Sequence, residues 1–107
     1  MSSFDDRRKS HEAKFAHDAE LRFKAEARRN KLLGIWAAEL MGLEGQEAKA
    51  YAAQVVASDF EEAGEEDVFR KVSGDLKAKN VDVSDETIRQ KMAQLVTQAQ
   101  EQVLAEG

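Results

Sequence analysis

The amino-acid sequence predicts an all-α fold, a small four-helix bundle that carries a flexible N-terminal arm. The 107-residue chain has no proline and only six glycines, whereas turns between strands usually need Gly, Pro or Asn. Four segments repeat apolar residues every three or four positions, as amphipathic helices do. Hydrophobic residues make up 42% of the chain and charged residues 35%, which allows one small core.

The first helix is expected from about Asp18 to Met41, with Gly42 as its stop signal. Its apolar residues fall close to one stripe, and the largest of them, Trp36, is expected to be structural. The stripe consists of Ala19, Phe23, Ala27, Leu32, Leu33, Trp36 and Leu40.

The second helix is expected from about Gln46 to Ala63, followed by Gly64 at the position of a left-handed cap. Its apolar residues recur at intervals of three and four, which predicts one buried face. That face consists of Ala48, Tyr51, Ala52, Val55, Val56, Phe60 and Ala63.

The third helix is expected from about Glu65 to Lys79, and acidic residues in its first turn suit a helix N-terminus. Gly74 weakens this helix by about 1 kcal/mol relative to alanine. The buried face is expected to hold Val68, Phe69, Val72 and Leu76.

The fourth helix has the clearest start signal, because Ser84 is an N-cap candidate followed by acidic residues. Val83 and Ile88 occupy the two positions of a hydrophobic staple. The stripe that follows consists of Ile88, Met92, Leu95, Val96, Ala99 and Val103.

Short connections between these segments favour antiparallel neighbours around one core. We expect Trp36, Phe60 and Phe69 to be its largest members. Loop lengths leave open whether the helices pack regularly or are splayed.

Residues 1–17 differ from the rest, because Phe4, His11 and Phe15 make too thin an apolar stripe to order the segment alone. We expect residues 1–17 to be mobile in the free protein, with latent helicity that a partner selects. Residues 18–107 form the expected bundle domain.

Composition and motifs indicate that the chain is not an enzyme. Cysteine is absent, which excludes disulfides and thiolate chemistry. No nucleotide-binding, zinc-protease or nucleophile-elbow motif is present, so we expect no catalytic residues and no metal site. The chain has no apolar run long enough for a bilayer and no secretory signal. We therefore expect a cytoplasmic protein without direct membrane insertion.

Charge is unevenly distributed, although the net charge is −5. Residues 1–31 hold nine basic and six acidic residues, whereas residues 32–107 hold seven and fifteen. A basic turn formed by Arg28, Arg29, Asn30 and Lys31 interrupts the first apolar stripe. It is either a solvated face or a secondary electrostatic contact with an acidic partner or nucleotide phosphates. The net charge disfavours DNA or RNA. No cofactor is expected, although weak nucleotide binding stays open.

Three stretches of the sequence resemble the ζ subunit of alphaproteobacterial F-type ATP synthases. They are FDDRRKSHEAKFAHDAELRFKAEARRNKLLGIWAAELMG at 4–42, AYAAQVVASDFEEAGEEDVFRKVSGDL at 50–76 and TIRQKMAQL at 87–95. The resemblance implies a small helical inhibitor of ATP hydrolysis, similar in role to the mitochondrial ATPase inhibitory factor. Its implied partners are the α, β and γ subunits of the synthase head, on the inner face of the cell membrane.

The resemblance also implies which residues inhibit. In this family the N-terminal segment, here Ser2 to about His17, becomes helical as it enters an α/β catalytic interface near γ. Carried over by position, the partner-binding residues are Phe4, Asp5, Asp6, Arg7, Arg8, Lys9, Glu12, Lys14 and Phe15. The competing hypothesis is a helical binding module without inhibitory action, a nucleotide-sensing or nucleic-acid adaptor with a basic arm.

Overall fold

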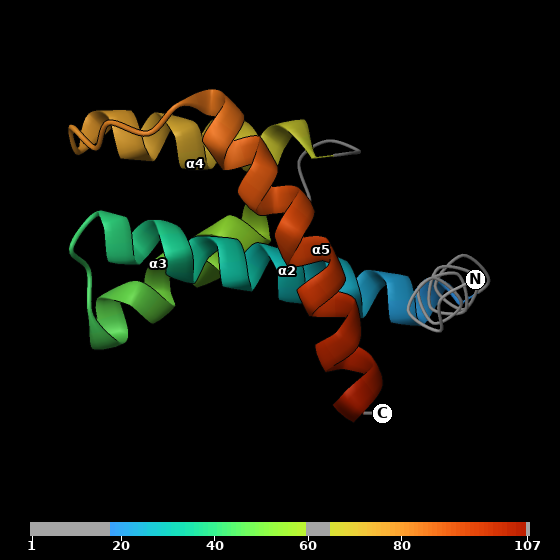
Figure 1. Ribbon diagram of the computed structural model, residues 1–107. Helices are drawn as coiled ribbons and strands as arrows, with labels where there is room; N and C mark the ends of the chain where they lie inside the picture. Colours follow the sequence, from blue (N-terminus) through green and yellow to red (C-terminus); the bar gives the residue numbers. More distant parts are fainter. Residues whose placement is uncertain (1–17, 60–64, 107) are drawn as a thin grey trace.

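The computed structural model describes residues 18–59 and 65–106, which fold into four α-helices (Figure 1). The helices are α2 (Ala19–Leu40), α3 (Gly45–Ser58), α4 (Glu66–Ala78) and α5 (Asp85–Glu106). No strand occurs in these two ranges. The predicted all-α fold with four helices is therefore confirmed, and the expected arm, residues 1–17, lies outside the described residues.

Side-chain caps explain where two of the helices begin. The Asp18 carboxylate accepts the N–H groups of Glu20 and Leu21 at 3.0 and 3.1 Å, which caps α2. The Ser84 hydroxyl accepts the Thr87 N–H at 3.1 Å, as the N-cap prediction for the fourth helix requires. Each cap satisfies amide groups that have no carbonyl partner in the first helical turn.

The second helix, predicted to end at about Ala63, ends earlier in the structure. Helix α3 ends at Ser58, and Asp59 is its C-cap residue. Residues 60–64, which include Phe60 and the expected cap at Gly64, lie outside the described ranges.

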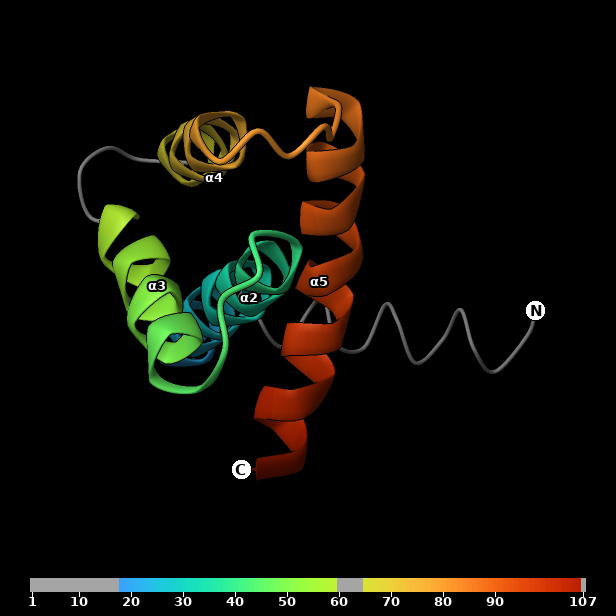
Figure 2. The same cartoon turned by 90° about the vertical axis from the view of Figure 1, so that its left-hand side faces the viewer.

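Helix α2 is the central element of the fold. It makes its most extensive contacts with α3 and α5, and a smaller contact with α4. Helix α5 crosses α2 steeply in Figure 1, and the view along α2 in Figure 2 shows the same crossing. The four helices are therefore splayed around α2 instead of running side by side as a regular bundle.

The core draws on all four helices. The largest fully buried side chains include Leu33 on α2, Val55 on α3, Leu76 on α4 and Ile88 on α5. Phe69 is also buried, as predicted. A smaller apolar cluster forms where the N-terminal half of α2 meets the end of α5, around Ala25 and Val103. Burial of one face of each amphipathic helix stabilises this arrangement.

The predicted apolar stripe of the first helix was partly wrong. Phe23 is 57% exposed and Leu40 is 40% exposed, and Trp36 is only partly buried at the margin of the core. Three other helices pack around α2, so its buried face is wider than one stripe and favours small residues. The buried residues of α2 are Ala25, Arg29, Asn30, Leu33, Gly34, Ala37 and Ala38.

Helices α2 and α3 approach each other closely at Gly34. A Cβ atom at this position would lie 2.6 Å from the Ala52 Cα and 3.1 Å from the Ala52 Cβ. Non-bonded carbon atoms prefer separations of about 3.5–4.0 Å. The two backbones are therefore as close as they are because position 34 has no side chain.

Candidate functional site

The candidate site lies around the first half of α2, because this part of the described structure directly follows the expected inhibitory residues in the chain. Nine of the candidate residues lie outside the described residues. They are Phe4, Asp5, Asp6, Arg7, Arg8, Lys9, Glu12, Lys14 and Phe15. The remaining three, Arg28, Arg29 and Lys31, lie together on α2, and the structure gives each a different environment.

Arg29 points into the protein. Its side chain is 6% exposed and forms a 2.8 Å ion pair with Glu65, the residue that precedes α4. Its Nε and Nη2 groups also donate to the Asn30 side-chain oxygen at 3.0 and 2.9 Å. A buried guanidinium needs such partners. Arg29 therefore ties α2 to α4, a role that the sequence did not reveal because Glu65 is 36 residues away.

Arg28 and Lys31 lie on other sides of α2. The Arg28 guanidinium donates to the Gln102 side-chain oxygen at 2.9 Å and pairs with Glu106, both on α5. Lys31 is exposed and has no ion-pair partner among the described residues. The basic turn is thus divided between α4, α5 and solvent, and it is not one uniformly solvated face.

Two adjoining hollows form a groove along α2, which we call the α2 groove. The first, about 730 Å³, is lined by Lys31 and Ile35 of α2 and by Lys49, Ala52, Ala53 and Val56 of α3. The second, about 380 Å³, shares Lys31 and Val56 with the first. Its other lining residues are Phe23, Lys24, Ala27 and Arg28 of α2 and Val103 and Glu106 of α5.

The rim of the α2 groove is basic, although the chain as a whole is acidic. Four cations line it against one carboxylate, Glu106. Lys24 pairs with Glu20 at 3.4 Å, but Lys49, like Lys31, has no ion-pair partner in the part of the chain that the structure describes. The groove therefore combines an apolar floor with unpaired positive charge.

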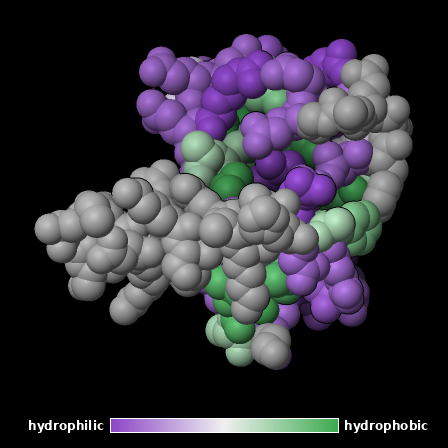
Figure 3. Space-filling view, turned by 90° about the vertical axis from the view of Figure 1, so that its right-hand side faces the viewer, coloured by the Kyte–Doolittle hydropathy of each residue, from purple (hydrophilic) through white to green (hydrophobic). Residues whose placement is uncertain are grey.

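The surface seen from the N-terminal end of α2 is uneven in hydropathy. Figure 3 shows largely hydrophilic side chains over α4 at the top of the molecule. Hydrophobic side chains reach the surface lower down, toward the C-terminal end of α5 (Figure 3). The second hollow of the groove includes Val103 from this part of α5.

A third hollow lies on another side of α2, against α5. It measures about 160 Å³, and its lining includes Arg22, Glu26 and the paired residues Arg29 and Glu65. Small-molecule sites usually occupy about 300–1,000 Å³. This hollow is below that range, and the guanidinium that lines it is already paired.

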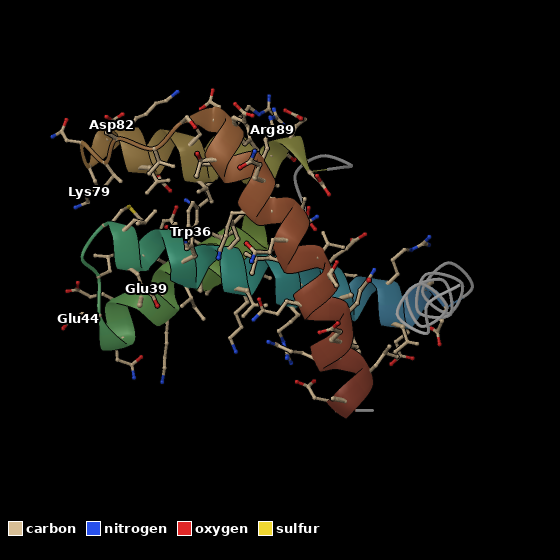
Figure 4. All side chains as sticks on the ribbon, in the orientation of Figure 1. Trp36, Glu39, Glu44, Lys79, Asp82 and Arg89 are labelled. Carbon is tan, nitrogen blue, oxygen red and sulfur yellow. The ribbon has the colours of Figure 1, made fainter. Side chains whose placement is uncertain are left out.

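Polar ties outside the groove connect α4 to its neighbours. The Tyr51 hydroxyl on α3 donates to the Asp75 carboxylate on α4 at 2.8 Å; burial, reinforced by that carboxylate, raises the pKa of Tyr51. Arg89 on α5 (Figure 4) donates to both carboxylate oxygens of Glu66 at 3.0 and 3.2 Å. These hydrogen bonds lower the pKa of Glu66.

The described residues contain neither a cluster of metal-binding side chains nor a membrane-spanning helix. No three His, Cys, Asp or Glu side chains in 18–59 and 65–106 are grouped so that they could hold a metal ion. None of the four helices is both long enough and apolar enough to cross a membrane.

Comparison with known proteins gives a family match and a structural match. A family model described as ATPase inhibitor subunit zeta matches residues 1–102. A chain from a solution NMR structure is 53% identical over 81% of this chain and 99% of its own length, with a TM-score of 0.73. No curated protein matches.

Proposed function

The chain belongs to the family of ATPase inhibitor subunits zeta, and we propose that residues 1–17 carry out the inhibition. In this proposal the segment enters an α/β catalytic interface of an F-type ATP synthase head, near the γ subunit, and blocks ATP hydrolysis. The four helices hold the segment at the head. The protein acts at the inner face of the cell membrane, on the cytoplasmic side, without entering the membrane.

The observation that carries the proposal is the extent of the family match, which covers residues 1–102 and therefore includes the whole N-terminal segment. The location of the core and of the first helix cap supports the proposal. The core is built from residues of α2 to α5, and Asp18 caps α2 with its own side chain. Among the described residues, the helical domain therefore has its own core and its own first cap.

Inhibition by this segment follows from how rotary catalysis works. Each catalytic interface must change conformation during turnover, and a segment that fits only one conformation stabilises it at the expense of the others. Phe4 and Phe15 would bury apolar surface in the interface, while Arg7, Arg8, Lys9 and Lys14 would pair with acidic groups on the head. Asp5, Asp6 and Glu12 would meet basic groups there.

The test measures ATP hydrolysis by the cognate synthase head with the full chain, with a chain lacking Met1 to Lys14, and with Arg7→Glu plus Arg8→Glu. We expect the full chain to inhibit, the deletion to abolish inhibition and the charge reversal to weaken it. Lys79→Glu is the control, because Lys79 lies at the end of the molecule opposite the N-terminus of α2 (Figure 4).

Thermal unfolding of the same proteins separates inhibition from folding. The deletion should leave the melting transition of the helical domain nearly unchanged, because the core lies in α2 to α5. A deleted chain that inhibits as well as the full chain would contradict the proposal, and so would one that no longer folds. A full chain that binds nucleotide or nucleic acid but never inhibits would favour the adaptor hypothesis.

A further inference from the structure

The α2 groove has the composition of a helix-binding surface. Its floor includes Ala53 of α3, whose short, exposed side chain leaves room beside α2, and the buried Ala52, which lies against Gly34. Ile35 and Val56 supply larger apolar surface beside them. An apolar groove between two helices is the usual receptor for the apolar face of an amphipathic helix.

The length of the groove also suits a helix. Phe23, Ala27, Lys31 and Ile35 line it at intervals of four residues, so each lies beside the next along the surface of α2. Twelve helical residues rise by about 18 Å. A partner helix of about three turns would therefore contact the full length of the groove.

The charge of the rim defines the partner. Four cations and one carboxylate line the groove, in a chain whose net charge is −5. Lys31 and Lys49 border the larger hollow and have no ion pair within the described ranges. Carboxylates that flank the apolar stripe of a partner helix would pair with these lysines and set its register.

We propose that the α2 groove binds an acidic amphipathic helix on the outer surface of the synthase head, beside the interface that residues 1–17 enter. This inference rests on the proposed function. The groove begins at Phe23, five residues after the cap at Asp18, so both contacts lie at the same end of the protein. Two linked contacts give a higher affinity than either contact alone, because the first raises the effective concentration of the second.

The test uses full-length chains with single changes in the groove and matched changes outside it. Lys49→Glu reverses one unpaired rim charge, and Lys79→Glu makes the same change at a distant exposed lysine. Ala53→Tyr fills the floor with a bulky side chain, and Ala50→Tyr places the same side chain on α3 outside the lining of the groove. All four positions are exposed, so the helices should be retained, which circular dichroism checks.

The primary measurement is the dissociation constant for the purified synthase head in about 0.1 M salt. We expect each groove variant to raise it about tenfold and each control to stay within twofold of the original chain. Raising the salt concentration should weaken the original chain more than Lys49→Glu, since screening acts on the pair that this variant lacks.

Inhibition measured at saturating protein separates this inference from the proposed function. Both groove variants should inhibit fully once enough protein is added, because residues 1–17 are unchanged. A chain that binds the head without inhibiting would contradict the proposed function. The dissociation constants of the groove variants would still test the groove in that case.

Three results would overturn the groove assignment. The first is a dissociation constant that stays within twofold for both groove variants. The second is a loss, in these variants, of binding to vesicles of anionic phospholipid while head binding is unchanged. The third is a groove-dependent dimer of the chain in sedimentation analysis, with head binding unaffected.

Discussion

Replacing Gly34 by alanine tests the close approach of α2 and α3. The new Cβ atom would lie 2.6 Å from the Ala52 Cα, and 3.3 Å from a Val55 methyl carbon. Normal carbon contacts are about 3.5–4.0 Å, so the helices would have to separate by about 1 Å. Overpacking of this kind costs about 1–3 kcal/mol, while alanine gains about 1 kcal/mol over glycine in helix propensity.

Gly74→Ala is the matched comparison, because Gly74 also lies inside a helix but a Cβ there would have no neighbour within 4 Å. Both variants gain the same propensity, so the difference between their unfolding free energies isolates the packing cost. We expect Gly74→Ala to be stabilised by about 1 kcal/mol and Gly34→Ala to lie about 1–3 kcal/mol below it.

Urea unfolding followed by circular dichroism measures this difference, with equal m-values as the check that both variants unfold from comparably compact states. In thermal unfolding, 1 kcal/mol corresponds to about 4–8 °C for a domain of this size. If Gly34→Ala proves as stable as Gly74→Ala, the backbones of α2 and α3 are not in close contact at position 34.

Three further predictions concern side chains with defined partners. Arg29→Ala should lower the unfolding free energy by about 1–3 kcal/mol, because it leaves the buried Asn30 oxygen without its donor. Lys31→Ala, at an exposed neighbour, should change the unfolding free energy little. Equal losses for the two variants in urea unfolding would show that Arg29 is not buried. Ser84→Ala should lower the unfolding free energy by about 1 kcal/mol in the same assay, because the N-cap of α5 is lost. An unchanged urea midpoint would show that this cap does not stabilise α5. Arg89 lowers the pKa of Glu66, so the stability that this pair contributes is present above the unfolded pKa and is lost as pH falls through the folded pKa. Glu66→Gln should therefore be less stable than the original chain at neutral pH and equal to it in acid, and a difference that persists in acid would contradict the assignment.

Features that depend on neighbouring residues in the chain could be predicted from the sequence. The N-cap at Ser84 and the buried faces of α4 and α5 follow from spacing within a few residues, and the structure has them. The family resemblance likewise rested on continuous stretches of sequence, and the match over residues 1–102 confirms it.

Features that depend on packing between helices could not be predicted in this way. The burial of Arg29 requires Glu65, which only the fold brings close. The exposure of Phe23 follows from the side of α2 that α3 and α5 leave uncovered. The α2 groove itself exists only once Lys31 and Lys49, from two helices, lie along the same hollow.

The cap at Asp18 has a mechanical consequence. Its backbone is extended, with φ −118° and ψ 101°, and its carboxylate holds the N–H groups of Glu20 and Leu21. A helix arriving from the N-terminal side would need those same N–H groups for its own carbonyls, so helical hydrogen bonding cannot pass through Asp18 while the cap is closed. Extending α2 toward the N-terminus would therefore require this cap to open, at a cost of about 1 kcal/mol.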